Sequence, residues 1–140
     1  HATRPWQHVL EPLAGYLLLA ARLMEEGGAS HARAWNFGPK DDEPVPVSRI
    51  ATRFAAGLGH PADRALELMT PDPKAPKETH LLRVDSTQAR VQLGWRPLLS
   101  VDEAVDWTAA WYRAWLDDPG AAAKALAQQL ASYDERLTTP

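Results

Sequence analysis

Glycine and proline interrupt this 140-residue chain repeatedly, and these breaks divide it into separate helices and strands. Glycine readily takes the left-handed conformation that ends a helix, and proline continues neither a helix nor a central strand. Between the breaks, apolar spacing predicts a mixed α/β chain, mostly helical, with two or three short strands. The breaks are Gly27-Gly28, Gly38-Pro39, Gly59-His60-Pro61, Gly94 to Pro97 and Pro119-Gly120.

Helical spacing predicts the helices, and capping residues indicate where several of them begin. Ser48 is expected to cap the second helix, and Asp85 with Gln88 has the spacing of a capping box. Ser100 and Glu103 repeat that spacing in its Ser-x-x-Glu form. The helices are predicted over residues 7–26, 49–58, 86–93, 101–117 and 121–136. In the first, the apolar stripe consists of Val9, Leu13, Tyr16, Leu17, Ala20, Leu23 and Met24.

Strands are predicted over residues 32–37, 65–70 and 80–84. Strands this short and this far apart do not form a large independent sheet, so we expect them to extend or cap a sheet supplied from elsewhere. The chain opens on His1 instead of an initiator methionine. We therefore interpret it as a segment of a longer protein.

Three tryptophans, Trp107, Trp111 and Trp115, fall four residues apart in the fourth predicted helix. Such a stripe could be a stacking platform for bases or sugars. Val101, Ala104 and Leu116 lie beside it, and large apolar groups at helical spacing are typical of a face packed on a core. The core interpretation is the favoured one.

Composition excludes several classes of function. The chain has no cysteine, which rules out disulfides and thiolate zinc sites and suits a cytoplasmic location. Its five histidines never fall four residues apart on one helix, so no metal site is expected. A net charge of -3 with interspersed signs does not favour nucleic-acid binding. No apolar run reaches the roughly 20 residues of a membrane span.

The first residues place one arginine directly ahead of a long apolar helix. Because Pro5 fixes its own φ, Arg4 is biased toward an extended conformation and a helix can begin soon after it. An arginine in that position can present a planar charged fork to a phosphate. The alternative is a surface arginine paired with a nearby acid.

Motifs of a self-contained enzyme are absent. Gly57-Leu58-Gly59 lacks the third glycine of a dinucleotide fingerprint and ends a helix instead of opening one. No tyrosine is followed four residues later by lysine, and no paired acids lie in apolar surroundings. No residue is therefore assigned a catalytic, cofactor-binding or metal-binding role. What remains is anion recognition by Arg4, with Asn36, Glu78 and His80 as further polar candidates.

Five blocks of the sequence resemble the C-terminal part of the CDP-glucose 4,6-dehydratases, a family of extended short-chain dehydrogenases/reductases. The resemblance runs in order from residue 1 to about Tyr133, and the first block is the most specific. Relatives acting on other nucleotide sugars usually have an acid where this chain has Pro5. The blocks are residues 4–17 (RPWQHVLEPLAGYL), 34–39 (AWNFGP), 46–48 (PVS), 78–85 (ETHLLRVD) and 93–97 (LGWRP).

The resemblance implies a longer protein whose N-terminal Rossmann domain binds NAD and carries the catalytic residues. The whole of residues 1–140 would then be its smaller, mostly helical, C-terminal substrate-binding region. The family oxidises the sugar at C4, eliminates water across C5 and C6, and returns the hydride to C6. The product is CDP-4-keto-6-deoxyglucose.

The resemblance also implies roles for single residues. The family's arginine at the position of Arg4 contacts the nucleotide diphosphate, so this role is carried over to Arg4. Some relatives have a second arginine near the position of Ala75, where His80 or Lys77 could substitute weakly. Asn36 is a weaker substrate-binding candidate, because its block favours a side chain bonded to nearby backbone.

The first hypothesis is the CDP-glucose-binding portion of such a dehydratase, inactive alone. One alternative is a dehydratase or epimerase for another nucleotide sugar. Another is a non-enzymatic helical module that docks a protein partner. For a lone segment we expect exposed apolar surface, and hence a homo-oligomer or a retained partner, the missing Rossmann half.

Overall fold

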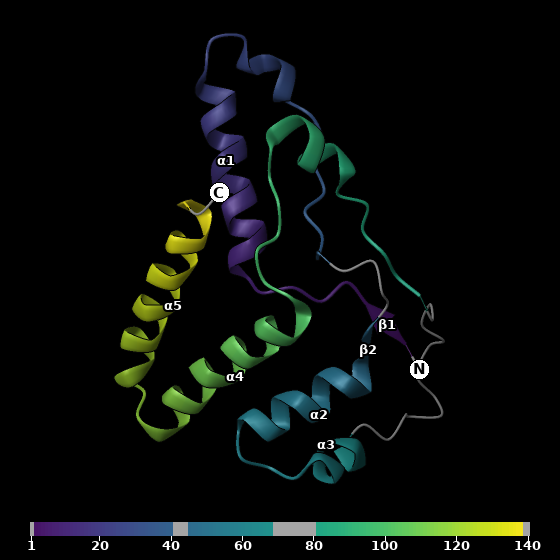
Figure 1. The fold of residues 1–140 in the computed structure, drawn as a ribbon, viewed down its shortest axis with the longest axis vertical. Coiled ribbons are helices and arrows are strands. Elements are labelled where there is room, and N and C mark those ends of the chain that lie inside the picture. Colours follow the sequence, from purple (N-terminus) through teal and green to yellow (C-terminus); the bar gives the residue numbers. More distant parts are fainter. Residues whose placement is uncertain (1, 41–44, 69–80, 139–140) are drawn as a thin grey trace.

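The computed structural model describes residues 2–40, 45–68 and 81–138, and the chain is mostly helical with a two-stranded sheet (Figure 1). The predicted fold class is therefore confirmed. The elements in chain order are β1 (Thr3–Arg4), α1 (Leu10–Met24), the 3₁₀ turn η1 (Gly28–His31), β2 (Val45–Pro46), α2 (Val47–Gly57), α3 (Ala62–Leu68), the π-helical turn η2 (Ala89–Leu93), α4 (Val101–Asp117) and α5 (Ala121–Thr138).

Helix α1 lies within the predicted range 7–26, with Pro12 in its first turn, where a missing N–H costs no helical bond. Gly27 follows it at φ 79°, the left-handed conformation expected after a helix. Its buried residues are Leu10, Glu11 and Gly15. Gly15 is needed there, because a Cβ at this position would lie 2.4 Å from Cδ1 of Phe37.

The apolar stripe of α1 is exposed. Leu17 is 73% and Met24 87% accessible, and the other members of the stripe are also exposed. The helix is instead packed through the opposite side, which carries Gly15 and the half-buried Leu18. A long row of apolar side chains on α1 thus has no covering in the described part of the chain.

Two apolar clusters form the core, and α1 contributes to both. The first contains Phe37, Ala89, Leu93 and Trp95, with Leu18, Leu19 and Trp35 packed against it. The second contains Leu10, Leu99 and Tyr133, with Ala14, Leu98 and Trp107 packed against it. Helix α1 therefore joins the middle of the chain to its C-terminal helices.

Helix α4 begins with the predicted capping box. Ser100 Oγ accepts from the Glu103 backbone N–H, and the Glu103 carboxylate accepts from the Ser100 backbone N–H at 2.9 Å. Helix α4 packs against both α2 and α5. Of its tryptophans, Trp107 and Trp111 are half-buried and Trp115 is 44% exposed, so the stripe is only partly a core face.

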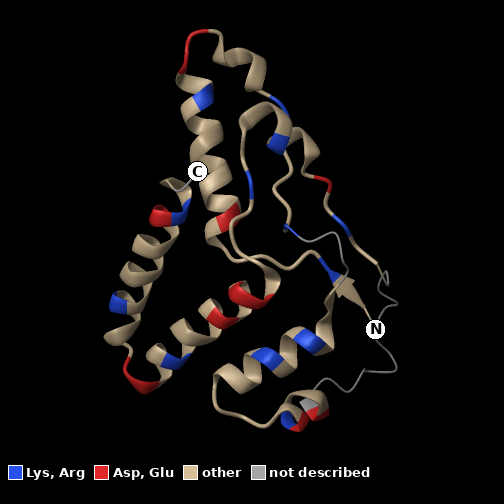
Figure 2. Cartoon of the chain, viewed as in Figure 1, with Lys and Arg blue, Asp and Glu red and all other residues tan. Residues whose placement is uncertain are grey.

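Ion pairs join α2 to the first turns of α4. Arg49 contacts Asp102 at 3.0 Å, and Arg53 contacts Asp106 at 2.6 Å. Figure 2 shows the basic residues of α2 and the acidic residues of α4 on neighbouring helices. The carboxylates of α4 are thus the partners of these two arginines, in exposed ion pairs that contribute little stability.

The strand predictions were largely wrong. Residues 32–37 form no strand in the described chain. Of the range 65–70, residues 65–68 lie in α3, whose Ala, Arg, Leu and Glu are good helix formers, and residues 69–70 lie outside the described residues. Of the range 80–84, residues 81–84 are described, and among these only Leu81 makes a bridge, parallel to Thr3. The sheet is β1 with β2, antiparallel, and Arg4 pairs with Val45.

Two predicted caps also differ. Ser48 lies inside α2, whose N-cap is Pro46, because the helix begins two residues earlier than predicted. Asp85 does accept the backbone N–H of Thr87 at 2.8 Å, and bonding to Thr87 lowers the pKa of Asp85. Gln88, however, reaches the Ala34 carbonyl instead of completing a capping box.

Candidate functional site

Arg4 lies on β1, the short strand that precedes α1. Its Nη1 donates to the Thr3 carbonyl at 2.8 Å, and the side chain is half-buried. The strand is held on one side by β2, and the Val47 N–H donates to the Ala2 carbonyl at 3.1 Å. The predicted extended backbone at Arg4 is confirmed, and the strand that carries it is held to residues 45–47.

The turn between β1 and α1 contains buried polar side chains. Gln7 Nε2 donates to the Phe37 carbonyl at 2.9 Å. Trp6 Nε1 and Gln7 Oε1 are buried without a hydrogen-bond partner in the described residues. Two such orphans beside Arg4 are unusual, because buried polar groups are normally satisfied.

His8 completes this turn and is 6% exposed. Its Nδ1 accepts from the Leu10 N–H at 3.3 Å, and its ring meets the edge of Trp107 at 5.8 Å. Burial lowers the pKa of His8, so the neutral ring is favoured. His8 therefore behaves as a core histidine.

The other predicted substrate-binding residues are placed as follows. Asn36 is exposed, and its side chain makes no hydrogen bond to the residues that the structure describes. It precedes Phe37, whose carbonyl is held by Gln7, so its segment lies beside the turn that follows Arg4. His80, with Ala75, Lys77 and Glu78, lies outside the described residues.

Glu11 is a buried carboxylate that the sequence reading missed. It is 1% exposed, and its Oε1 accepts the N–H groups of Leu98 and Leu99 at 2.9 and 2.7 Å. Its Oε2 accepts the Tyr133 hydroxyl at 2.8 Å, and its backbone carbonyl accepts Trp95 Nε1 at 3.2 Å. Burial and the hydrogen bond to Glu11 raise the pKa of Tyr133. No local sequence pattern indicated it, because Glu11 lies outside the apolar stripe of α1.

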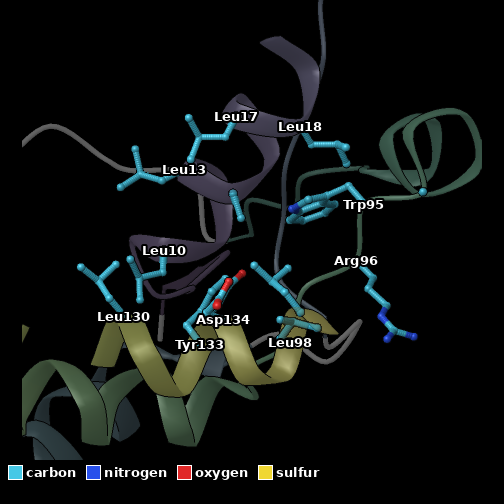
Figure 3. A pocket seen from close by; sticks show the side chains of 13 residues that line it. Leu10, Leu13, Leu17, Leu18, Trp95, Arg96, Leu98, Leu130, Tyr133 and Asp134 are labelled. Atoms are coloured by element: carbon cyan, nitrogen blue, oxygen red, sulfur yellow. The ribbon is translucent and has the colours of Figure 1, made fainter. Parts of the chain in front are cut away.

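An apolar groove of about 680 Å³ runs between α1 and α5 (Figure 3). Leucines of α1 line one wall, and Leu130 and Tyr133 of α5 line the other, with Trp95 and Leu98 at its side. The groove adjoins the exposed stripe of α1. Its lining residues are Leu10, Leu13, Ala14, Leu17, Leu18, Gly94, Trp95, Arg96, Leu98, Leu130, Tyr133, Asp134 and Leu137.

The described residues do not fit a dinucleotide or a metal. The glycines at 57 and 59 terminate α2, and Gly59 has φ 81°, so they do not open a helix toward a pyrophosphate. Residues 2–40, 45–68 and 81–138 contain no cluster of three possible metal ligands. Within the same ranges, no helix combines the length and apolarity required to cross a membrane.

The comparison with curated proteins finds a nucleotide-sugar dehydratase. It is the CDP-glucose 4,6-dehydratase of Salmonella typhimurium, which is 38% identical to this chain over 116 residues. The match covers 83% of this chain and 31% of that relative, so the chain spans about a third of the relative's length. No family model matches the chain. The resemblance indicated by the five sequence blocks is thus confirmed.

Proposed function

We propose that this chain is the C-terminal, CDP-sugar-binding region of a CDP-glucose 4,6-dehydratase, inactive without the rest of that enzyme. The observation that carries the proposal is the 38% identity over most of the chain. The structure supports it with an arginine on a fixed strand at the start of the most family-specific block.

The reaction proposed for the whole enzyme converts CDP-glucose to CDP-4-keto-6-deoxyglucose and water. NAD, bound by an N-terminal Rossmann domain, would take the hydride from C4 and return it to C6. Residues 1–140 would hold the nucleotide and supply no acid, base or hydride acceptor. This division agrees with the lack of a dinucleotide turn at the helix starts described above.

Arg4 is proposed to contact the diphosphate of the substrate. A guanidinium carries its charge at all accessible pH values and can donate two parallel hydrogen bonds to phosphate oxygens. Its place on β1 limits the freedom that the backbone would lose on binding. His80 and Asn36 remain proposed second contacts, and Asn36 is exposed beside the turn that follows Arg4.

The missing Rossmann half is the partner that we assign to the exposed stripe of α1 and the adjoining groove. The relative extends well beyond the matched third, which provides an occupant of sufficient size. Leu13 and Leu17 belong to both the stripe and the groove, so one apolar body could cover the two together. A second copy of the chain is the competing occupant.

Substituting Arg4 tests the proposal in the full-length enzyme. Arg4→Ala is expected to weaken CDP-glucose binding by about 1.5–3 kcal/mol, roughly 10- to 150-fold, because a charge-assisted contact is lost. Arg22→Ala is the matched control, since Arg22 is paired with Glu25 on the surface of α1. Isothermal calorimetry measures both. Unchanged affinity in Arg4→Ala would refute the assigned role.

The alternatives predict different outcomes. A dehydratase or epimerase for another sugar would turn over a different nucleotide sugar in preference to CDP-glucose. A non-enzymatic module would have no Gly-x-x-Gly-x-x-Gly or Tyr-x-x-x-Lys encoded upstream of residue 1. The exposed groove favours this second candidate only if no Rossmann half exists to fill it.

A further inference from the structure

We infer that Glu11 is a positioning residue, which sets the place of the Arg4 strand by fastening the start of α1 to both C-terminal helices. This inference rests on the proposed function, because Arg4 is the residue that is proposed there to bind the diphosphate. Glu11 itself lies in a buried cluster and is not proposed to touch the substrate.

The Glu11 carboxylate accepts hydrogen bonds from three groups that are distant in the sequence. Its donors come from two segments: the backbone at Leu98 and Leu99, just before α4, and the hydroxyl of Tyr133 on α5. None of these donors is a cation, so each contact that they make to the carboxylate is a hydrogen bond from a neutral group. The three donors must therefore stay close to the carboxylate, because a buried carboxylate without hydrogen-bond partners strongly destabilises the folded state.

The residues between Arg4 and Glu11 are linked by hydrogen bonds. The Glu11 N–H bonds to the His8 carbonyl at 3.1 Å, and Gln7 is tied to Phe37. The Trp6 N–H bonds to the Arg4 carbonyl at 3.0 Å. The backbone from Arg4 to Glu11 is therefore a short series of turns, and a shift at Glu11 moves the strand that carries Arg4. Displacements near 1 Å at a positioning group can cost about 100-fold in function.

The hydrogen bonds of the Glu11 side chain can be tested separately from its charge. Both backbone donors lie closest to Oε1, and the Tyr133 hydroxyl bonds to Oε2. A glutamine could keep its carbonyl oxygen on the backbone donors and donate its amide N–H to the Tyr133 oxygen. Glu11→Gln should therefore preserve the position of α1, whereas Glu11→Ala leaves two buried N–H groups without an acceptor.

Glu103 provides a matched control. It also accepts a backbone N–H at the start of α4 and a hydrogen bond from a side chain of α5, Arg136 at 2.9 Å, but among the described residues it makes no hydrogen bond to α1. Glu103→Gln thus weakens the join between α4 and α5 without touching the Arg4 segment.

The experiment measures CDP-glucose affinity and amide hydrogen exchange over residues 4–9 in the full-length enzyme. Glu11→Ala should weaken binding about tenfold and speed exchange in that segment at least about tenfold, Tyr133→Phe should do so about threefold, and Glu11→Gln should stay within about twofold of wild type. Glu103→Gln should alter neither quantity. If Glu11→Ala does not fold, the Tyr133→Phe and Glu11→Gln variants still test whether Glu11 positions the Arg4 strand.

Two results would overturn the inference. One is exchange in residues 4–9 that responds to Glu11 or Tyr133 variants no more than to Glu103→Gln. The other is a Glu11→Gln variant as impaired as Tyr133→Phe or worse. If Arg4→Ala binds CDP-glucose normally, the proposed function fails, and the exchange data alone then judge the positioning of the strand.

Discussion

Glu103 shows at the scale of one residue how a local pattern becomes stability. Hydrogen bonds from the backbone and side chain of Ser100, and then Arg136, lower the pKa of Glu103 from 4.5 to about 2. As pH falls, the unfolded chain takes up the proton first, so this contribution is present above about pH 4.5 and disappears by about pH 2. In the Glu103→Gln variant, the free energy of unfolding should therefore fall less steeply than in wild type as the pH drops from about 4.5 to about 2.

Chemical denaturation of the full-length enzyme at pH 7, 4 and 3 measures this effect. The destabilisation caused by Glu103→Gln should shrink as pH falls. Glu25→Gln is the control, because Glu25 is an exposed partner of Arg22 and should change the curve little. A difference between wild type and Glu103→Gln that is constant across these pH values would contradict the assignment.

The two glutamates also show what the sequence can reveal about single residues. The partner of Glu103 in the capping box is three residues away, so the pattern is visible in the sequence and the prediction is confirmed. The donors to Glu11 are 87, 88 and 122 residues away, and no local pattern indicates them. Arg4 was found from its neighbour Pro5 and from family resemblance, and its extended backbone is confirmed while its ligand stays a prediction.

At the scale of elements, α1 and the segment that contains Phe37 approach each other closely at Gly15. A Cβ on Gly15 would lie 2.4–2.8 Å from three ring atoms of Phe37, and that ring is packed edge-on against Trp95 at 5.1 Å. Gly15→Ala should destabilise the protein by about 1–3 kcal/mol, because overpacking outweighs the roughly 1 kcal/mol gained in helix propensity. Urea denaturation measures the change in the free energy of unfolding.

Gly120→Ala is the control for this substitution. Gly120 lies in the turn between α4 and α5, and its added Cβ would meet only the Asp118 side chain, at 3.3 Å. The expected change is within about 0.5 kcal/mol. Equal or higher stability in Gly15→Ala would show that the Phe37 ring can move aside.

Elements were predictable to different degrees for a physical reason. Long helices α1, α4 and α5 repeat their pattern over several turns and were predicted within a few residues of their ends. The alternation in residues 32–37 reflects Trp35 and Phe37 packing on the first core cluster, and the described chain provides no strand to pair with them. Apolar spacing does not show that a packing partner is present: a strand also requires a neighbouring strand, and the apolar stripe of α1 is exposed in the described chain.

At the scale of the whole molecule, the exposed stripe of α1 predicts what a polar substitution does in the full-length enzyme. Leu17 is 73% exposed here and lines the groove. If the Rossmann half covers it, Leu17→Glu should destabilise the full-length protein by about 1–3 kcal/mol, because a charge would be buried without a partner. Thermal unfolding and gel filtration would report stability and assembly.

Leu116→Glu is the matched control, since Leu116 on α4 is 58% exposed and does not line the groove. It should change stability by less than about 0.5 kcal/mol. Equal, small effects of the two substitutions would show that the stripe faces water in the complete enzyme. Loss of dimers with retained monomer stability in Leu17→Glu would identify a second copy as the occupant.

The hydrogen bond between Glu11 and Tyr133 also has a consequence for protein synthesis. The carboxylate is made 122 residues before the hydroxyl that completes its set of donors. During translation, α1 can form early as a helix. It cannot complete its packing until α5, which carries Tyr133, has left the ribosome. The N-terminal strand that carries Arg4 should therefore be among the last parts to reach its final position, although it is among the first to be made.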